Sequence, residues 1–204
     1  MPRPRSLTDE QIAAAAVAVV DRDGLGALSM RVVAEELDRS TMALYRYVTG
    51  REDLERLVVD YVLADVDLDR SPRASWPTQV TRLAEGARAA IAAHPGVAPL
   101  MLSHRHASQQ SRRWGESVMA ALADGGFAGK DRAIAFRTLL SYVFGAAQVE
   151  HLGPLSGPGT AALAGLDPAE YPNLADTARH ARAIPPDVEF RKGLAIILRG
   201  LGAG

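Results

Sequence analysis

Apolar residues recur every three to four positions along most of the chain, and no run alternates apolar residues with polar β-branched ones. This spacing places apolar side chains on one face of a helix, whereas a half-buried strand needs a period of two. The pattern therefore predicts an all-α protein.

Short polar or glycine-containing breaks divide residues 1–70 into helices. Thr8 and Gln11 have the spacing of a capping box, and Ser29 precedes an apolar stripe as a helix cap does. Arg3 and Arg5 precede the first helix and are expected to form an arm. We predict helices over residues 8–24, 29–37 and 41–47, and a fourth from Gly50 onward.

A polar stretch with two prolines, residues 65–77, separates this part from the rest of the chain. Such composition is typical of a linker, and we predict a boundary near residue 70 between one domain over 1–70 (the head) and another over 71–204 (the body). Residues 153–186 are rich in Pro, Gly and Ala and are expected to form a connector with one short helix over 174–183. The other helices of the body are predicted over residues 80–93, 98–103, 109–123, 131–152 and 187–201.

The composition narrows the class of protein. Hydrophobic residues make up 48% of the chain and charged residues 23%, which is typical of a folded globular protein. There is no cysteine, which excludes disulfides and cysteine-based zinc sites. Asp9 and Glu10 stand where a signal peptide needs its apolar core, and no uncharged stretch is long enough to cross a bilayer. We therefore expect a cytoplasmic protein with no membrane partner.

The charge pattern restricts where nucleic acid can bind. The net charge is only −1, and residues 1–56 carry 8 arginines against 10 acidic residues. A general electrostatic attraction to DNA is therefore not expected. A DNA-binding face in the head requires that its arginines and its acids lie on different sides.

Two short helices joined by a tight turn, with one helix before and one after, form the layout of a helix-turn-helix DNA-binding unit. Three strings support it: GLGALSMRVVAEEL at 24–37, MALYRYV at 42–48 and REDL at 51–54. Together they resemble the signature of the tetracycline-repressor (TetR) family, and the match runs from about residue 8 to residue 63 without a gap. The resemblance implies a three-helix helix-turn-helix head on a helical ligand-binding and dimerisation domain. It also implies a repressor that a small-molecule effector releases from double-stranded operator DNA.

The residue types in the head agree with that resemblance. Short side chains at the start of the recognition helix suit base edges in the major groove, and the Tyr and Arg side chains after them offer donors to phosphate. Arg31 is the further candidate for a base contact. The predicted DNA-binding residues are Arg31, Thr41, Met42, Ala43, Tyr45, Arg46, Tyr47 and Arg51. The predicted core beneath them consists of Ala34, Leu37, Leu44, Val48 and Leu54.

Two residues depart from the family pattern. Asp38 stands where the family usually has the glycine of the turn, and Arg39 where an apolar residue is usual. Asp tolerates the left-handed backbone conformation better than most residues. We therefore expect the turn to form and the operator preference to differ.

The body resembles the tetracycline-repressor subfamily more faintly, in His94-Pro95-Gly96, in 103–105 and in 190–194. In that subfamily a magnesium–tetracycline site uses a Glu four residues after a helix glycine, and this chain has Val149 at that place. We expect neither tetracycline nor a metal, and prefer an apolar or aromatic effector because the segment supplies few charges. The candidate ligand-binding residues are Met101, His104, Trp114, Phe136, Tyr142 and Gln148.

A homodimer is expected through the helices at 131–152 and 187–201, which carry more apolar residues than one chain can cover. Gly145, Ala146 and Gly193 would let the helices approach closely, and Leu194 and Leu198 are the predicted interface residues. No enzymatic activity and no cofactor are expected.

Two other interpretations compete with this one. The first is an all-helical hydrolase-like enzyme, which leaves the head unexplained. The second is a ligand-independent helix-turn-helix dimerisation module, which leaves the large, weakly charged body unexplained. The acid and base groups of the enzyme would be His94, His104, His106 and His151 with Glu116 or Glu150.

Overall fold

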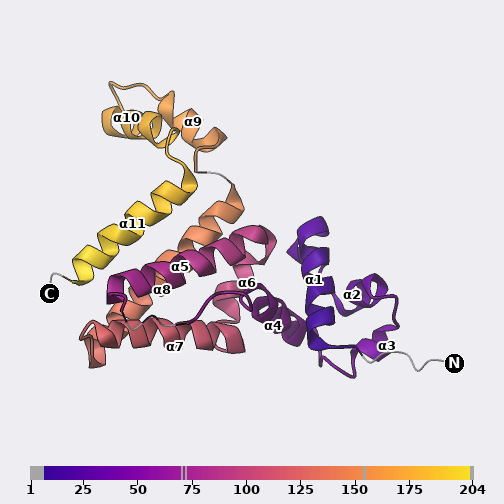
Figure 1. Ribbon diagram of the computed structural model, residues 1–204. Helices are drawn as coiled ribbons and strands as arrows, with labels where there is room; N and C mark the ends of the chain where they lie inside the picture. Colours follow the sequence, from indigo (N-terminus) through magenta and orange to yellow (C-terminus); the bar gives the residue numbers. More distant parts are fainter. Residues whose placement is uncertain (1–6, 70, 72, 154, 203–204) are drawn as a thin grey trace.

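The computed structural model describes residues 7–69, 71, 73–153 and 155–202. All regular structure in these ranges is helical, which confirms the predicted all-α fold. Figure 1 shows a small group of helices at the N-terminal end, a larger bundle beside it, and a pair of helices that projects from the bundle. The predicted arm with Arg3 and Arg5 lies outside the described residues. No described helix is both long enough and apolar enough to span a membrane.

The head consists of α1 (Asp9–Asp23), α2 (Met30–Glu36), α3 (Thr41–Leu44) and α4 (Arg51–Val62). Side-chain caps set where three of them begin. Thr8 and Gln11 exchange both hydrogen bonds of a capping box, at 3.1 and 3.2 Å. Ser29 accepts from the backbone N–H of Val32, and Ser40 accepts from that of Ala43. These bonds satisfy backbone donors that a helix leaves free at its start.

The turn between α2 and α3 passes through Asp38, whose φ is +51°. It is the one described non-glycine residue with positive φ, at the position where the family usually has glycine. The prediction that Asp permits this turn is therefore confirmed. Beneath it, Ala34, Leu44, Val48 and Leu54 are buried and Leu37 is partly buried, as expected for the core.

The body is built on α5 (Trp76–Ala93), α6 (Ala98–Ser103), α7 (Gln109–Asp124) and α8 (Gly129–Leu152), with α5 packed against α7 and α8. Trp114 of α7 is buried and donates its indole N–H to the carbonyl of Leu83 at 2.9 Å. The predicted start of α5 at residue 80 is wrong by one turn. Pro77 is part of the first turn of the helix, where its missing N–H costs nothing.

The segment 153–186 contains two helices, α9 (Pro158–Ala164) and α10 (Pro172–Ala181); α10 corresponds to the short helix predicted over 174–183, whereas α9 was not predicted. The two pack on each other and stand apart from the bundle (Figure 1). Their contact depends on small side chains such as Ala175 and Ala178, which are buried. The last helix, α11 (Pro186–Leu201), returns beside α8 and α5.

Candidate DNA-binding surface and effector pocket

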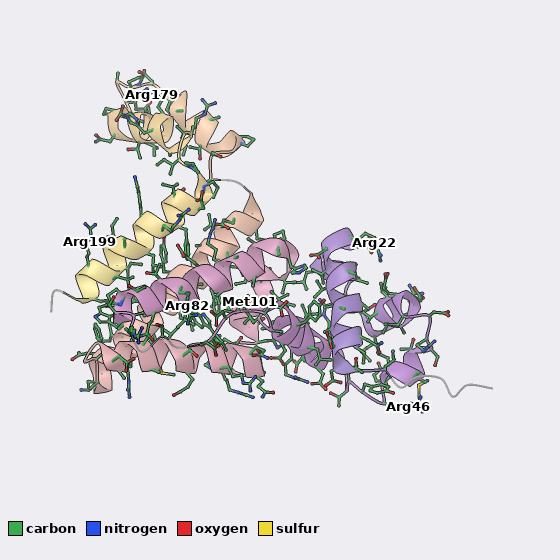
Figure 2. The ribbon with its side chains drawn as sticks, in the orientation of Figure 1. Arg22, Arg46, Arg82, Met101, Arg179 and Arg199 are labelled. Atoms are coloured by element: carbon green, nitrogen blue, oxygen red, sulfur yellow. The ribbon has the colours of Figure 1, made fainter. Side chains whose placement is uncertain are left out.

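The helix α3 and the turn after it present large side chains to solvent. Met42 exposes 74% of its surface and Tyr45 exposes 49%. Arg46 is also exposed and lies at the α3 end of the head, far from the body (Figure 2). The half-buried members of the predicted set are Thr41, Ala43 and Tyr47. An apolar side chain as exposed as Met42 contributes little to the fold, so this surface is suited to contact with a partner.

The predicted arginines differ in how firmly the protein holds them. Arg46 forms no ion pair with any described residue, and Arg31 lies 3.8 Å from Glu35 with both side chains mostly exposed. An exposed pair at that distance is weak. Arg51 instead donates to the carboxylate of Glu55 at 2.7 Å and to the carbonyl of Leu25 at 3.3 Å.

The acidic residues of the head are partly neutralised away from α3. Arg22 binds Glu36 at 2.9 Å, and Arg56 binds Asp53 and Asp60 at 3.2 and 3.0 Å. These pairs lie on α1, α2 and α4, whereas Arg46 follows α3 and has no acidic partner among the described residues. Asp38, just before α3, is also exposed and forms no ion pair with a described residue, so acidic and basic side chains are only partly separated around α3.

Asp53 joins the turn after α3 to the first turn of α4. Its carboxylate accepts from the backbone N–H of Thr49 at 3.1 Å and from the Thr49 hydroxyl at 3.0 Å. These two bonds, with a smaller contribution from Arg56, hold the pKa of Asp53 below its ordinary value. The charged form thus fixes the segment between the recognition helix and α4.

Polar side chains join the head to the body along α4. One oxygen of Glu55 accepts from Arg51, and the other lies 2.8 Å from Nε2 of His104 in the turn between α6 and α7. Burial alone would raise the pKa of Glu55, but the bonds from Arg51 and His104 outweigh it and lower the pKa. Arg51, which is predicted to contact DNA, and His104 of the body thus both contact the carboxylate of Glu55.

A second link joins α4 to the start of α7. One oxygen of Asp60 accepts from the hydroxyl of Ser108 at 2.6 Å and from the backbone N–H of Gln110 at 2.9 Å. Asp60 therefore caps a helix of the body from a helix of the head. A third link pairs Asp21 of α1 with His94 after α5 at 2.7 Å.

A cavity of about 730 Å³ opens between α7 and α8 and contains aromatic rings. Trp114 and Phe136, both predicted, line it together with Phe144. The ring of Trp114 stacks on that of Phe144 with centroids 5.6 Å apart, and lies 6.5 Å from that of Phe136.

The other four predicted ligand-binding residues do not line this cavity. Met101 is fully buried in the core in the middle of the body (Figure 2), and His104 faces Glu55. Gln148 donates to the carbonyl of Ala98 at 2.6 Å. Tyr142 lines a different groove, between α8 and α11, and donates to the carbonyl of Phe190 at 2.8 Å.

Sequence reasoning missed several residues of the cavity wall. Leu140 and Phe144 were missed, although they follow the predicted Phe136 at intervals of four residues on α8, which is a signal for one shared face. Ser111 lies one turn before Trp114 on α7 and lines the same cavity. The other missed lining residues are Arg105, His106, Arg112, Gly115, Glu116, Met119, Arg137 and Ser141.

The groups that an enzyme would need are not joined to one another. His94 and His104 each face a carboxylate of the head, and Glu150 pairs with Arg88 at 2.9 Å. His106 and Glu116 line the cavity with Ser111, but the Ser111 hydroxyl has no hydrogen-bond partner and so no base to activate it. Across the described ranges, no three His, Asp or Glu side chains lie together as metal ligands would.

Comparison with known families gives a match over the whole body and the two residues before it. The profile described as "Tetracyclin repressor-like, C-terminal domain" matches residues 69–204. An "HTH-type transcriptional regulator" of Saccharopolyspora erythraea is 33% identical over 144 residues, which are 71% of this chain and 61% of that protein. The "HTH-type transcriptional repressor DrrR1" of Streptomyces coeruleorubidus is 49% identical over 61 residues, which are 30% of this chain and 22% of that protein. The matches thus cover less than two thirds of either relative.

Solved structures match over nearly the whole chain. The TetR family protein ActR of Streptomyces coelicolor, crystallised with (S)-DNPA, superposes with a TM-score of 0.85 at 29% identity and covers 98% of this chain and 100% of its own. The same protein crystallised with actinorhodin gives a TM-score of 0.84 at 28% identity, over 98% of each chain.

Proposed function

Because the chain belongs to the tetracycline-repressor (TetR) family of transcriptional regulators, we propose that it is a repressor that binds operator DNA through its head and leaves it when a small molecule binds the body. Two features together carry the proposal. One is the exposed surface of α3 and the turn after it, with Met42, Tyr45 and Arg46, and the other is the aromatic cavity in the body. A protein that only binds DNA would not need that cavity.

In the proposed complex, α3 enters the major groove. Thr41, Met42 and Ala43 contact base edges, since short and apolar side chains suit the thymine methyl group and nearby acceptors. Tyr45, Arg46 and Tyr47 position the head on phosphates. Arg31 contacts a base or a phosphate from the first turn of α2. Arg51 reaches DNA only when it leaves Glu55.

The proposed homodimer is formed by α8 and α11. Ile134, Val149 and Ile196 expose 61%, 41% and 61% of their surface, and the proposed interface would bury them together as one apolar patch. Leu194 and Leu198 are buried within the chain and so are not available to a partner. Gly193 also serves the monomer, because a Cβ there would overlap the Tyr142 side chain. Gly145 has open space around it and remains available for a close approach.

The proposed effector is an apolar or aromatic molecule that binds between α7 and α8. The rings of Trp114, Phe136 and Phe144 support this choice, as do the two molecules crystallised with ActR. The cavity lies beside the links to α4. Its lining residues Arg105 and His106 follow His104, which faces Glu55. Its lining residue Ser111 follows Ser108, which binds Asp60. A ligand that shifts the start of α7 would therefore move α4 and the head with it.

The test is a gel-shift titration on the DNA upstream of the gene for this protein, with and without aromatic small molecules. We expect a discrete protein–DNA complex. Unlabelled upstream DNA should compete for the protein better than unrelated DNA, and an active compound should dissociate the complex. Equal competition by unrelated DNA would contradict sequence-specific binding.

A further inference from the structure

The cavity between α7 and α8 has an excess of positive charge that the protein does not neutralise. Arg105, Arg112 and Arg137 line its mouth; all three are exposed, and none of them forms an ion pair with a described residue. The acidic side chain in its lining is Glu116, which is exposed. Arginines elsewhere in the chain, such as Arg51, Arg56 and Arg88, do bind carboxylates.

Two of these arginines are held in place by backbone. Arg105 donates to the carbonyl of Leu102 at 2.5 Å, and Arg112 donates to that of His106 at 3.0 Å. A guanidinium has five N–H donors, so each keeps donors for another acceptor. Arg137, on α8, makes no hydrogen bond to the described part of the chain.

An unpartnered hydroxyl lies in the wall of the same cavity. Ser111 is only 6% exposed, and its Oγ has no hydrogen-bond partner although its backbone N–H is bonded to Ser108. A buried hydroxyl without a partner costs free energy, which an acceptor on a bound molecule would recover. This observation is independent of the arginines and leaves one unpaired hydroxyl in the cavity wall, although its oxygen is itself buried.

The rest of the wall is apolar and aromatic. Trp114 and Phe144 are stacked and almost fully buried, while Phe136 and Met119 are partly accessible. Flat aromatic surfaces of this kind bind ring systems by stacking or edge contacts.

We infer that the effector is a planar aromatic compound with an acidic group, whose rings lie against Trp114 and Phe136 and whose anion lies among Arg105, Arg112 and Arg137. This inference rests on the proposed effector cavity and adds the charge of its ligand. Arginine suits such a group because its planar donors match the two oxygens of a carboxylate or sulfonate.

The test uses two fluorescent probes that differ only in the acidic group: 1-anilinonaphthalene-8-sulfonate and its neutral counterpart N-phenyl-1-naphthylamine. Both are titrated into the full chain and into Arg137→Gln and Arg112→Gln. We expect each substitution to weaken binding of the sulfonate roughly two- to fivefold, as for a partly exposed ion pair, and to change binding of the neutral probe by less than about 1.5-fold. Arg113→Gln is the matched control, because Arg113 is exposed on the same helix and does not line the cavity. It should change neither affinity.

A further variant separates the inference from the proposed cavity. Phe136→Leu keeps an apolar side chain on α8 and should weaken both probes. Suppose that Phe136→Leu weakens the neutral probe while the arginine substitutions have no more effect than Arg113→Gln. The cavity would then be the binding site, and the inference that its ligand is acidic would be wrong. If neither probe responds to Phe136→Leu, the cavity is not the binding site and the inference falls with it. Operator binding in the gel shift is a separate readout that neither result changes.

Discussion

Arg46 and Arg51 are both arginines of the predicted DNA-binding set, but the structure gives them different roles. Arg46 is exposed and has no ion pair with a described residue, whereas Arg51 is bound by Glu55 and by the carbonyl of Leu25. To contact phosphate, Arg51 must break a charged hydrogen bond, which costs free energy. Arg46 carries no such cost and is the better test of phosphate contact.

We expect Arg46→Ala to weaken operator binding roughly three- to tenfold while the thermal midpoint stays unchanged, since the side chain contributes a phosphate contact and no core packing. Fluorescence anisotropy at moderate salt measures the affinity, and a weaker salt dependence should accompany the loss. Arg179→Ala, which removes an exposed arginine of α10 (Figure 2), is the control. Equal affinities for both variants would remove Arg46 from the binding surface.

Asp53 is expected to make a pH-dependent contribution to stability. Its pKa in the folded protein is lowered chiefly by hydrogen bonds from Thr49, so its contribution is present above the unfolded pKa of about 3.9 and is lost as the pH falls through the folded pKa. Asp53→Asn should lower the free energy of unfolding by about 1 kcal/mol at pH 7 and by less as the pH falls below about 4. Urea denaturation at several pH values measures the difference.

Glu52→Gln is the control for that series, because Glu52 lies on the same turn of α4 and makes no hydrogen bond to Thr49 or Arg56, both of which bind Asp53. A deficit of Asp53→Asn that is the same at pH 3 and pH 7 would show that the charge of Asp53 does not contribute.

At the scale of helices, Asp60 of α4 joins the head to the body because it caps the start of α7. Asp60 accepts from the hydroxyl of Ser108 and from the N–H of Gln110, so it satisfies a free donor at the start of α7. Asp60→Ala should lower the free energy of unfolding by about 1–2 kcal/mol, as loss of a helix cap does. Chemical denaturation measures it, with Asp65→Ala, an exposed acid just after α4, as the control. Similar stability of the two variants would contradict a structural role for the cap.

The helices that could be predicted from the sequence are those with a distinctive cap or a distinct apolar face. Thr8 and Ser29 precede α1 and α2, and each makes the bond that its position predicts; Ser40 makes the same kind of bond before α3. α10 overlaps the helix predicted over 174–183, whereas α9 has seven residues, begins with Pro158 and Gly159 and buries none of its side chains, so no apolar stripe marks it. Small side chains at a helix contact leave little periodic signal.

The cavity was only partly predictable for a related reason. α8 is apolar nearly all round, so its sequence does not tell which side faces α7, which faces the core and which is exposed. Trp114, chosen for its size, and Phe136, chosen because its helical register predicts that it faces inward, both line the cavity, but Gln148 bonds to α6 and Tyr142 faces α11. The arginines were not considered because charged residues at a cavity mouth have no pattern of their own in the sequence.

At the scale of the whole molecule, the exposed apolar side chains of α8 and α11 determine the expected assembly. Ile196→Asp should convert the proposed dimer into a monomer, because an interface that buries a charge without a partner is strongly destabilised. Sedimentation velocity measures the mass. Met42→Asp places the same charge on an exposed apolar residue of the head and should leave the dimer intact. A dimer that survives Ile196→Asp would place the interface elsewhere.

Effector and operator are expected to oppose each other through the shape of the dimer. Two heads that read one face of DNA must sit about 34–36 Å apart, or a multiple of that distance, so a modest rotation of α4 breaks one of the two contacts. If a compound acts this way, it binds the DNA-incompetent arrangement more tightly, and operator weakens its binding by the same factor. We expect that, for any compound that dissolves the gel-shift complex, its Kd rises with operator concentration and then reaches a plateau. The plateau reports a ternary complex in which both sites are occupied. A compound that blocks the DNA surface directly would instead show a Kd that keeps rising with operator, and a Kd unchanged by operator would leave the body as a dimerisation domain without an allosteric role.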